Sequence, residues 1–298
     1  MINNQPLVSV GIPTYNRPEG LRRTLECITN QTYKTLQIIV SDNCSPNSKV
    51  EIIVKDFINK DNRITYYKQK ENSGAANNFK FVLEKATGEY FMWAADDDEW
   101  DSSFISITVS FLVNNKNYIA VSTEAQYYDG HQKFDFFSEG KPFYKFHSDN
   151  ELERLKYMLK YNYGNLVYGM YRLNILKALP IIFVKNEIPF LVQIIFMGNW
   201  KVLPEIRLYK KTNIYTYRQA KWEKVGGKLL DKRFNLNYLK ELKNNYYYHK
   251  VAYKHIKQAI NTLKLSASNK KLCSNYSYKI LFRHYMNFVF LRKKPLFL

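Results

Sequence analysis

Residues 7–13 read LVSVGIP, a short and largely apolar run that ends at a proline. A run of this length and composition, stopped by a turn residue, is typical of a buried strand. Pro18 follows shortly afterwards and favours the first turn of a helix, with Asn16 as its candidate cap. We expect this helix to run to about Thr29, so the chain opens with a strand and then a helix.

The same alternation repeats three more times along the chain. Strands are expected at about 36–41, 64–68 and 90–94, and helices at about 49–59, 75–86 and 102–114. Such an order predicts an α/β fold in which a mostly parallel sheet lies between layers of helices. Ligands bind these sheets outside the carboxyl ends of the strands. The rule selects three polar segments for one site: 13–17, 42–43 and 96–98.

Beyond about Tyr127 the pattern is weaker. Asp129-Gly130 indicates a turn, and residues 202–204 and 206–209 are expected to be extended. Helices are expected at 151–161 and 186–197, and then at 234–248, 251–265 and 278–291. Gly226-Gly227 is a candidate hinge, so we predict a domain at 1–225, with two halves at about 1–125 and 126–225, and a helical extension at 226–298.

Charge is distributed unevenly along the chain. The 298 residues carry a net charge of +19, and residues 221–298 hold 18 Lys and Arg against 3 Asp and Glu. A basic segment rich in Tyr and Phe favours an anionic membrane surface or a nucleic acid, although Lys- and Tyr-rich usage explains part of the excess. We expect neither a spanning helix nor a signal peptide. Three widely spaced cysteines favour a reducing, cytoplasmic setting.

Asp96-Asp97-Asp98 directly follows the expected strand at 90–94. Three adjacent carboxylates repel one another unless a divalent cation or hydrogen-bond donors neutralise them. Mg²⁺ and Mn²⁺ bind one or two carboxylates together with the phosphate oxygens of a substrate. The triplet is therefore either a metal site for a phosphorylated ligand or a solvated acidic loop, because Glu99 and Asp101 follow it.

Two further polar segments are candidates for ligand contacts. Asp42 ends the second expected strand, where a carboxylate accepts hydrogen bonds from a base or a ribose, or simply stabilises a turn. Asn72, Gly74 and Asn78 surround the start of the third expected helix. Glycine allows a close backbone approach and the amides form hydrogen bonds, although the same residues also serve as a helix cap.

Four segments together resemble family 2 glycosyltransferases. They read VSVGIPTYNR at 8–17, IIVSDNCS at 38–45, Asn72-x-Gly74-x-x-x-Asn78, and Gly88-Glu89-Tyr90 leading into Asp97-Asp98. Their order and spacing match the family over residues 6–110. The resemblance implies the GT-A fold, with a donor half at about 1–125 and an acceptor half at about 126–225. It also implies a nucleoside-diphosphate sugar donor and inverting transfer to a hydroxyl group.

The resemblance also implies roles for individual residues. Asp42 would contact the base, Arg17 the diphosphate, and Asp98, with Asp96, the metal ion. Ala95 stands where many relatives have an aspartate, so ribose or metal contacts would fall to Asp96 and Asp97. The remaining donor-binding residues implied by the four segments are Pro13, Thr14, Tyr15, Asn72, Gly74 and Asn78.

The catalytic base is expected in the second half of the chain. Glu187 in NEIPFL (186–191) fits the acidic residue that relatives carry before the acceptor-facing helix. Its alternative is a first-turn glutamate that the helix dipole favours. Tyr217-Arg218 either closes over the diphosphate or lies on the surface.

The expected function is thus a metal-dependent transferase of surface-polysaccharide synthesis. It would use Mn²⁺ or Mg²⁺, a UDP-linked donor, and a lipid-linked or glycan acceptor, on the inner face of the membrane. One alternative is an inactive protein of the same fold that binds a sugar or nucleotide. A nucleic-acid-binding protein is the other, and no RRM, KH or zinc-finger pattern supports a nucleic-acid partner.

Overall fold

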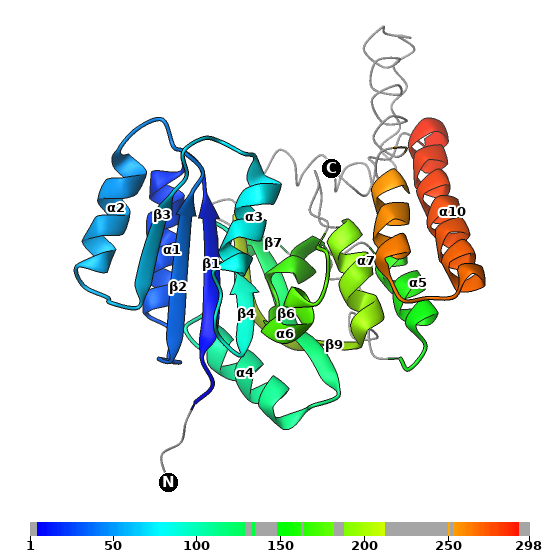
Figure 1. The fold of residues 1–298 in the computed structure, drawn as a ribbon, viewed down its shortest axis with the longest axis horizontal. Coiled ribbons are helices and arrows are strands. Elements are labelled where there is room, and N and C mark those ends of the chain that lie inside the picture. The colour runs from blue at the N-terminus through cyan, green and yellow to red at the C-terminus, as the bar shows by residue number, and fades with distance from the viewer. Residues whose placement is uncertain are drawn as a thin grey trace, which may run out of the picture.

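The computed structural model describes residues 5–128, 133–134, 148–161, 164–181, 188–211, 250 and 253–291, and Figure 1 shows their arrangement. Strands and helices alternate through the first half. The strands are β1 Val8–Thr14, β2 Leu36–Asp42, β3 Ile64–Lys68, β4 Tyr90–Trp93, β5 Asp98–Trp100, β6 Tyr118–Tyr128, β7 Lys133–Phe134, β8 Met170–Arg172 and β9 Asn199–Lys211. The helices are α1 Pro18–Thr29, α2 Lys49–Ile58, α3 Ala75–Glu84, α4 Phe104–Asn114, α5 Glu151–Tyr161, η1 Gly164–Tyr168, α6 Leu173–Lys177, α7 Ile188–Met197 and α10 Ala267–Leu291.

One sheet joins both halves of the chain, in the order β3-β2-β1-β4-β8-β6-β9-β5, and β7 pairs with β6. Strands β1 to β4 are parallel to one another, as predicted. In the second half β8 enters antiparallel to β4 and β6, and β5 runs antiparallel to β9. The sheet is therefore mixed, because the regular strand–helix alternation that produces parallel pairs ends after α4.

The residues of the central strands alternate between two hydrophobic cores. Val10 of β1 and Met92 of β4 face a core shared with α1, α2 and α4, whereas Phe91 and Trp93 face a second core. This second core contains residues of α3, α5 and α7. Because successive strand residues point to opposite faces, both faces of the sheet are covered by helices, which is the predicted three-layer arrangement.

Two local predictions differ from the structure. Asn16 does not cap α1: Arg17 occupies the cap position without a side-chain cap bond, and Asn16 has a φ of 54°. The side-chain oxygen of Asn16 instead accepts a hydrogen bond from Asn47. The two short extended pieces around Pro204 form one strand, β9, whose pairing with β6 skips from Leu203 to Ile206. Proline lacks the N–H that a continuous ladder requires, so a bulge accommodates it.

The described C-terminal helices pack against the rest of the molecule. Ile256 and Ile260, from a helix over residues 253–262, and Cys273 of α10 belong to the core that also contains residues of α5 and α7. Helix α10 begins at Ala267, eleven residues before the predicted start at Tyr278. The candidate hinge at Gly226-Gly227 and the helix expected at 234–248 lie outside the described residues. Within the described part of the chain, no helix combines the length and apolar character needed to cross a membrane.

Candidate active site

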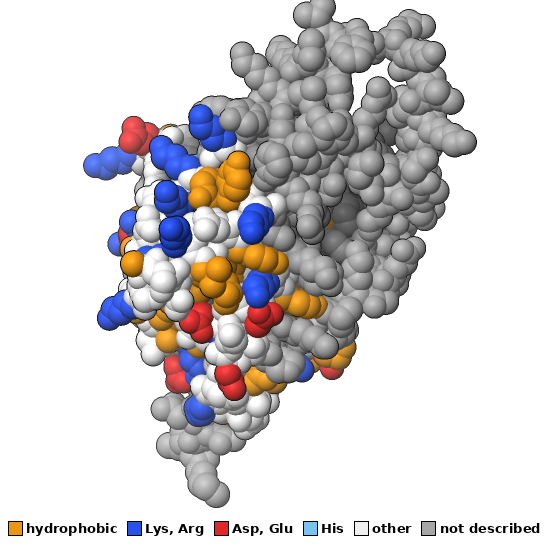
Figure 2. All heavy atoms as spheres, turned by 90° about the vertical axis from the view of Figure 1, so that its right-hand side faces the viewer, with side chains coloured by type: hydrophobic (Ala, Val, Ile, Leu, Met, Phe, Trp, Pro, Cys, Tyr) orange, Lys and Arg blue, Asp and Glu red, His pale blue; other side chains and the backbone are white. Residues whose placement is uncertain are grey.

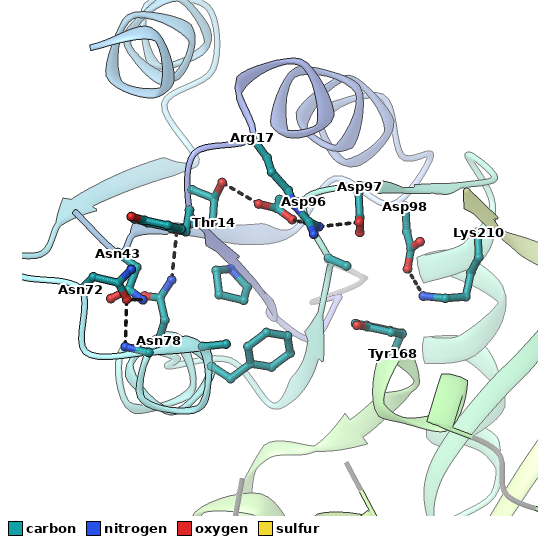
Figure 3. A pocket seen from close by; sticks show the side chains of 16 residues that line it. Thr14, Arg17, Asn43, Asn72, Asn78, Asp96, Asp97, Asp98, Tyr168 and Lys210 are labelled. Atoms are coloured by element: carbon teal, nitrogen blue, oxygen red, sulfur yellow. Dashed lines mark hydrogen bonds and ion pairs between the residues drawn. The ribbon is translucent and has the colours of Figure 1, made fainter. Parts of the chain in front are cut away.

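The carboxyl ends of β1, β2 and β4 meet at one edge of the sheet. Thr14 at the end of β1 pairs with Asp42 at the end of β2, and Gly11 pairs with Trp93 of β4. A cavity of about 650 Å³ opens at this edge. Its lining residues come from both halves of the chain (Figure 3): Pro13, Thr14, Tyr15, Arg17, Asn43, Asn72, Gly74, Ala75, Asn78, Phe79, Ala95, Asp96, Asp97, Asp98, Tyr168 and Lys210.

The backbone of the acidic segment 96–98 is held by α1. Thr24 donates its hydroxyl to the carbonyl oxygens of Ala95 and Asp98, at 2.9 and 3.1 Å. Gly20, one turn earlier, lies so close to the Asp96 carbonyl that an added Cβ would collide with it. Helix α1 therefore fixes the position of the carboxylates relative to the cavity.

We expect Gly20→Ala to move the acidic segment away from its position in the cavity. Overpacking of this kind typically costs about 1–3 kcal/mol of stability, and a displacement of about 1 Å in an active site costs roughly 100-fold in rate. Thermal unfolding and turnover measured together check this expectation. Glu26→Ala, at an exposed position of the same helix, is the control, and equal activity of both variants would contradict the positioning role.

The three carboxylates have different surroundings. Asp96 accepts hydrogen bonds from Thr14 at 2.8 Å and from Arg17 at 3.2 Å, and its side chain is 10% exposed. Asp97 pairs with the same Arg17 nitrogen at 2.5 Å, but its side chain is 43% exposed. Asp98 is 2% exposed and pairs with Lys210. Asp97 is thus the carboxylate with the greatest access to a ligand in the cavity.

Burial changes the acidity of this segment. Removal from water disfavours the charged form of a carboxylate, and burial raises the pKa of Asp96 above its usual value. Burial likewise raises the pKa of Asp98 to about 6, although the neighbouring Lys210 lowers it. At neutral pH, Asp98 is therefore mostly ionised and forms an ion pair with the lysine (Figure 3).

Asp42 is not among the residues that line the cavity. It is buried, and one carboxylate oxygen accepts hydrogen bonds from the backbone N–H of Ser45, at 2.9 Å, and from its hydroxyl. The other oxygen accepts a bond from the hydroxyl of Tyr66 at 3.0 Å. In this structure Asp42 therefore stabilises the turn that carries Asn43, whose side chain does line the cavity.

An amide network forms the wall opposite the carboxylates. Asn43 donates to the side chain of Asn72 at 2.8 Å and accepts a bond from the backbone of Ser73. Asn78 donates to the backbone oxygens of Ser41 and Thr14, which ties the ends of β2 and β1 to α3. Gly74 precedes α3 with a φ of 86°, a left-handed conformation that favours glycine.

Several functional positions differ from the sequence-based prediction. Lys210 and Tyr168 line the cavity although no motif marked them, because the pairing of β5 with β9 and the position of η1 bring them there. Tyr15 is 44% exposed in the cavity and is available to a ligand. Glu187, the predicted base, and Tyr217-Arg218 lie outside the described residues. Within the described ranges, no group of three or more His, Cys, Asp or Glu side chains forms a metal site.

A family model described as "Glycosyl transferase family 2" matches residues 9–177, more than half of the chain. The chain belongs to glycosyl transferase family 2. The matched range runs from β1 to α6 and contains every cavity-lining residue except Lys210.

Named relatives resemble a little over a third of this family 2 chain. The putative teichuronic acid biosynthesis glycosyltransferase TuaG of Bacillus subtilis is 31% identical over 113 residues, which are 38% of this chain and 44% of TuaG. The Escherichia coli protein named UDP-Glc:alpha-D-GlcNAc-diphosphoundecaprenol beta-1,3-glucosyltransferase WfaP is 34% identical over 116 residues, 39% of this chain and 45% of WfaP. The chain thus spans less than half of the length of these relatives.

Solved structures show the same fold over nearly the whole chain. TarS 1–349 of S. aureus in complex with UDP-GlcNAc superposes with a TM-score of 0.61 at 18% identity, covering 95% of this chain and 73% of TarS. The mannosyltransferase PcManGT of Pyrobaculum calidifontis, in complex with GDP-Man and Mn²⁺, gives a TM-score of 0.51 at 17% identity, covering 97% and 85%. The family 2 chain therefore has the GT-A fold that was predicted from its sequence.

Proposed function

We propose that this protein is an inverting glycosyltransferase that transfers a sugar from a nucleoside-diphosphate donor to a hydroxyl group. The observation that carries the proposal is the cavity at the strand ends, which combines three carboxylates, two cations and an amide wall. Its volume of about 650 Å³ lies within the range of small-molecule sites. Membership of family 2 supports the reaction class, and UDP in the names of WfaP and the TarS complex supports a UDP-linked donor.

The cavity residues fit a divalent cation that a substrate helps to hold. Mg²⁺ and Mn²⁺ typically need only one or two carboxylates besides phosphate oxygens and water. Asp97 offers an accessible carboxylate, and Asp98 offers a second one once Lys210 leaves it. We therefore propose Asp97 and Asp98 as the protein ligands, while Asp96, bonded to Thr14 and Arg17, orients the segment or contacts the ribose. When bound, the ion would stabilise the negative charge of the departing diphosphate.

Different residues would bind the nucleoside, neutralise the phosphates and remove the acceptor proton. Tyr15 and the amides of Asn43 and Asn72 would hold the nucleoside, and Arg17 would neutralise phosphate charge at the mouth of the cavity. Glu187 would remove the proton from the acceptor hydroxyl as its oxygen attacks the anomeric carbon. Attack from the face opposite the diphosphate inverts the configuration and requires no covalent sugar–enzyme intermediate.

A nucleotide-sugar screen tests this function directly. UDP-, GDP-, CDP- and dTDP-linked sugars would be examined for binding and for slow hydrolysis, each with Mn²⁺, with Mg²⁺ and with EDTA. The proposal expects one nucleotide class to bind with metal-dependent turnover. Binding without any turnover towards water or added acceptors would instead identify an inactive binding protein of the same fold.

Asp42→Ala is expected to weaken donor binding more than it slows the chemical step. Loss of this carboxylate releases Ser45 and Tyr66 and loosens the turn that carries Asn43. The loss of a charged hydrogen-bonding group corresponds to roughly 10- to 100-fold in affinity, and a nucleoside contact present in both ground and transition states changes KM rather than kcat. Calorimetric titration with the nucleotide selected by the screen gives the measurement.

Tyr66→Phe is the matched control for this prediction. It removes one of the bonds to Asp42 and changes no cavity-lining residue. An equal loss of affinity in both variants would assign Asp42 to the turn alone. Unchanged nucleotide binding in Asp42→Ala would remove Asp42 from the binding site altogether.

We propose a lipid-linked acceptor and an anionic membrane surface as further partners. The name of WfaP includes a diphosphoundecaprenol acceptor, and the sequence of this chain contains no acidic residue after Glu241. The described C-terminal helices pack on the domain. Exposed lysines lie on these helices and in the connection between them: Lys254, Lys257, Lys264, Lys271 and Lys279. Figure 2 shows basic and hydrophobic side chains interspersed over the described part of one face.

Liposome binding is expected to depend on these lysines. Each cation near an anionic surface contributes about 1 kcal/mol, so Lys254, Lys257 and Lys271 changed together to Glu should lower sedimentation with anionic liposomes at low salt by more than tenfold. Lys60, Lys70 and Lys116, also exposed, changed to Glu, give the same change in net charge on the N-terminal half. If both triple variants sediment alike, these helices have a structural role only.

A further inference from the structure

Lys210 is fixed opposite Asp98 by the pairing of two strands. β5 and β9 are antiparallel with Asp98 directly across from Lys210, and the ammonium group forms an ion pair with Oδ2 of Asp98 (Figure 3). The same ammonium lies 4.2 Å from the centre of the Tyr168 ring. The lysine side chain is 17% exposed and lines the cavity. Its charge is therefore at the wall of the donor cavity rather than in the protein core.

The charged residues that line the cavity leave it with a net negative charge. Three carboxylates, Asp96 to Asp98, face two cations, Arg17 and Lys210. A nucleoside diphosphate adds further negative charge, so its binding is unfavourable until a divalent cation binds with it. The described residues thus favour simultaneous binding of ion and nucleotide over binding of either one alone.

The two cations differ in the number of carboxylates that they contact. Arg17 pairs with two, Asp96 and Asp97, although its side chain is 57% exposed. Among the described residues, Lys210 pairs with one carboxylate, Asp98, and its compact charge is carried on a flexible stem. Asp98 in turn is the second carboxylate available to a metal ion. A lysine and a divalent cation bound to the same carboxylate compete, because their like charges repel at this distance.

We propose that Lys210 is an exchangeable counter-ion that couples metal binding to donor binding. Without ligands, Lys210 neutralises Asp98 and so weakens the binding of a divalent cation. With nucleotide and ion bound together, Lys210 would leave Asp98 and turn to a phosphate oxygen of the donor, and Asp98 would be available to hold the ion. No covalent bond changes in this exchange. The inference rests on the proposed donor chemistry and adds a mechanism by which the free enzyme disfavours metal binding in the absence of donor.

Mn²⁺ binding measured by electron paramagnetic resonance tests this exchange without any turnover. Lys210→Gln retains a hydrogen-bond donor for Asp98 but removes the competing charge, and Lys210→Met removes both. We expect Mn²⁺ alone to bind Lys210→Gln about tenfold more tightly than wild type, within the usual range of coupling between sites. The factor by which UDP tightens Mn²⁺ binding should fall correspondingly, and UDP should bind the Mn²⁺-loaded variant more weakly.

Two comparisons show whether the effect arises at Asp98. In an Asp98→Asn background, Lys210→Gln should no longer change the affinity for Mn²⁺. Lys70→Gln, which removes an exposed charge just beyond β3, should leave the affinity unchanged in either background. Equal Mn²⁺ affinities of wild type and Lys210→Gln would overturn the proposal, as would a gain that persists in the Asp98→Asn background.

Different experimental results would reject this inference and the proposed function. If wild type binds no nucleotide or nucleotide-sugar with any metal, the donor proposal is lost. Competition between Lys210 and Mn²⁺ at Asp98 is still measured, because that comparison uses the metal alone. If nucleotide binds but Lys210→Gln and wild type have the same coupling between UDP and Mn²⁺, only the role of Lys210 is lost.

Discussion

Asp97→Asn is expected to nearly abolish transfer while the fold remains intact. The substitution removes the most exposed carboxylate of the acidic segment, whose side chain is 43% accessible. Loss of a metal ligand that stabilises the leaving group costs several kcal/mol in the transition state, which corresponds to a fall in kcat of roughly 100- to 10,000-fold. Single-turnover rates with saturating donor and Mn²⁺ measure the effect.

Glu99→Gln is the matched control for Asp97→Asn. Glu99 belongs to the same acidic run, but it contacts Tyr128 and Arg23 and does not line the cavity. The expected result is near-normal activity for Glu99→Gln. Asp98→Asn should also lose most activity, although it leaves Lys210 without its carboxylate, which makes it the less selective test. If Asp97→Asn retains normal kcat in EDTA-treated buffer, the metal assignment is wrong.

Glu187→Gln is expected to lower the rate of transfer while donor binding stays almost unchanged. The amide keeps the size and shape of the side chain and cannot accept a proton from the acceptor hydroxyl. Loss of a general base typically costs roughly 100- to 10,000-fold in rate. Separate measurement of nucleotide affinity and kcat distinguishes this loss from a defect in donor binding.

Glu205→Gln provides the comparison for the proposed base. Glu205 is an exposed acidic residue of β9 in the same half of the chain and does not line the cavity. Full transfer activity in both variants would remove Glu187 from the mechanism. A selective loss in Glu187→Gln, with a pH–rate profile that loses its lower limb, would support its role as the base.

The structure shows how the three adjacent carboxylates of residues 96–98 are neutralised. The sequence alone left open whether a metal ion or hydrogen-bond donors neutralise three adjacent carboxylates. In the structure Thr14, Arg17 and Lys210 supply much of this neutralisation. These contacts stabilise the segment in the structure, and the proposed role of a divalent ion concerns the charge that a diphosphate brings into the cavity.

The sequence by itself determined the donor half of the fold. Short apolar runs, each followed by a helical segment, predicted β1 to β4 and their parallel order, because local periodicity and turn residues set the strands and their connections. The rule that ligands bind at the carboxyl ends of parallel strands then predicted a site that contains Thr14, Asp42 and Asp96. In the structure these three residues lie together at one edge of the sheet. Both inferences depend on residues that are neighbours in sequence or on strands whose pairing follows from their connections.

Only the tertiary structure decided which of these groups faces the cavity and which stabilises it. Asp42 and Asp97 are both carboxylates after strands, but one is buried against Tyr66 and Ser45 while the other is exposed to a ligand. Lys210 is 112 residues from Asp98 along the chain, and the pairing of β9 with β5 makes them partners. Such contacts arise from antiparallel pairing in the second half of the sheet. No local pattern specifies that pairing, because β5 has only three residues, β9 is irregular, and the two strands are far apart in sequence.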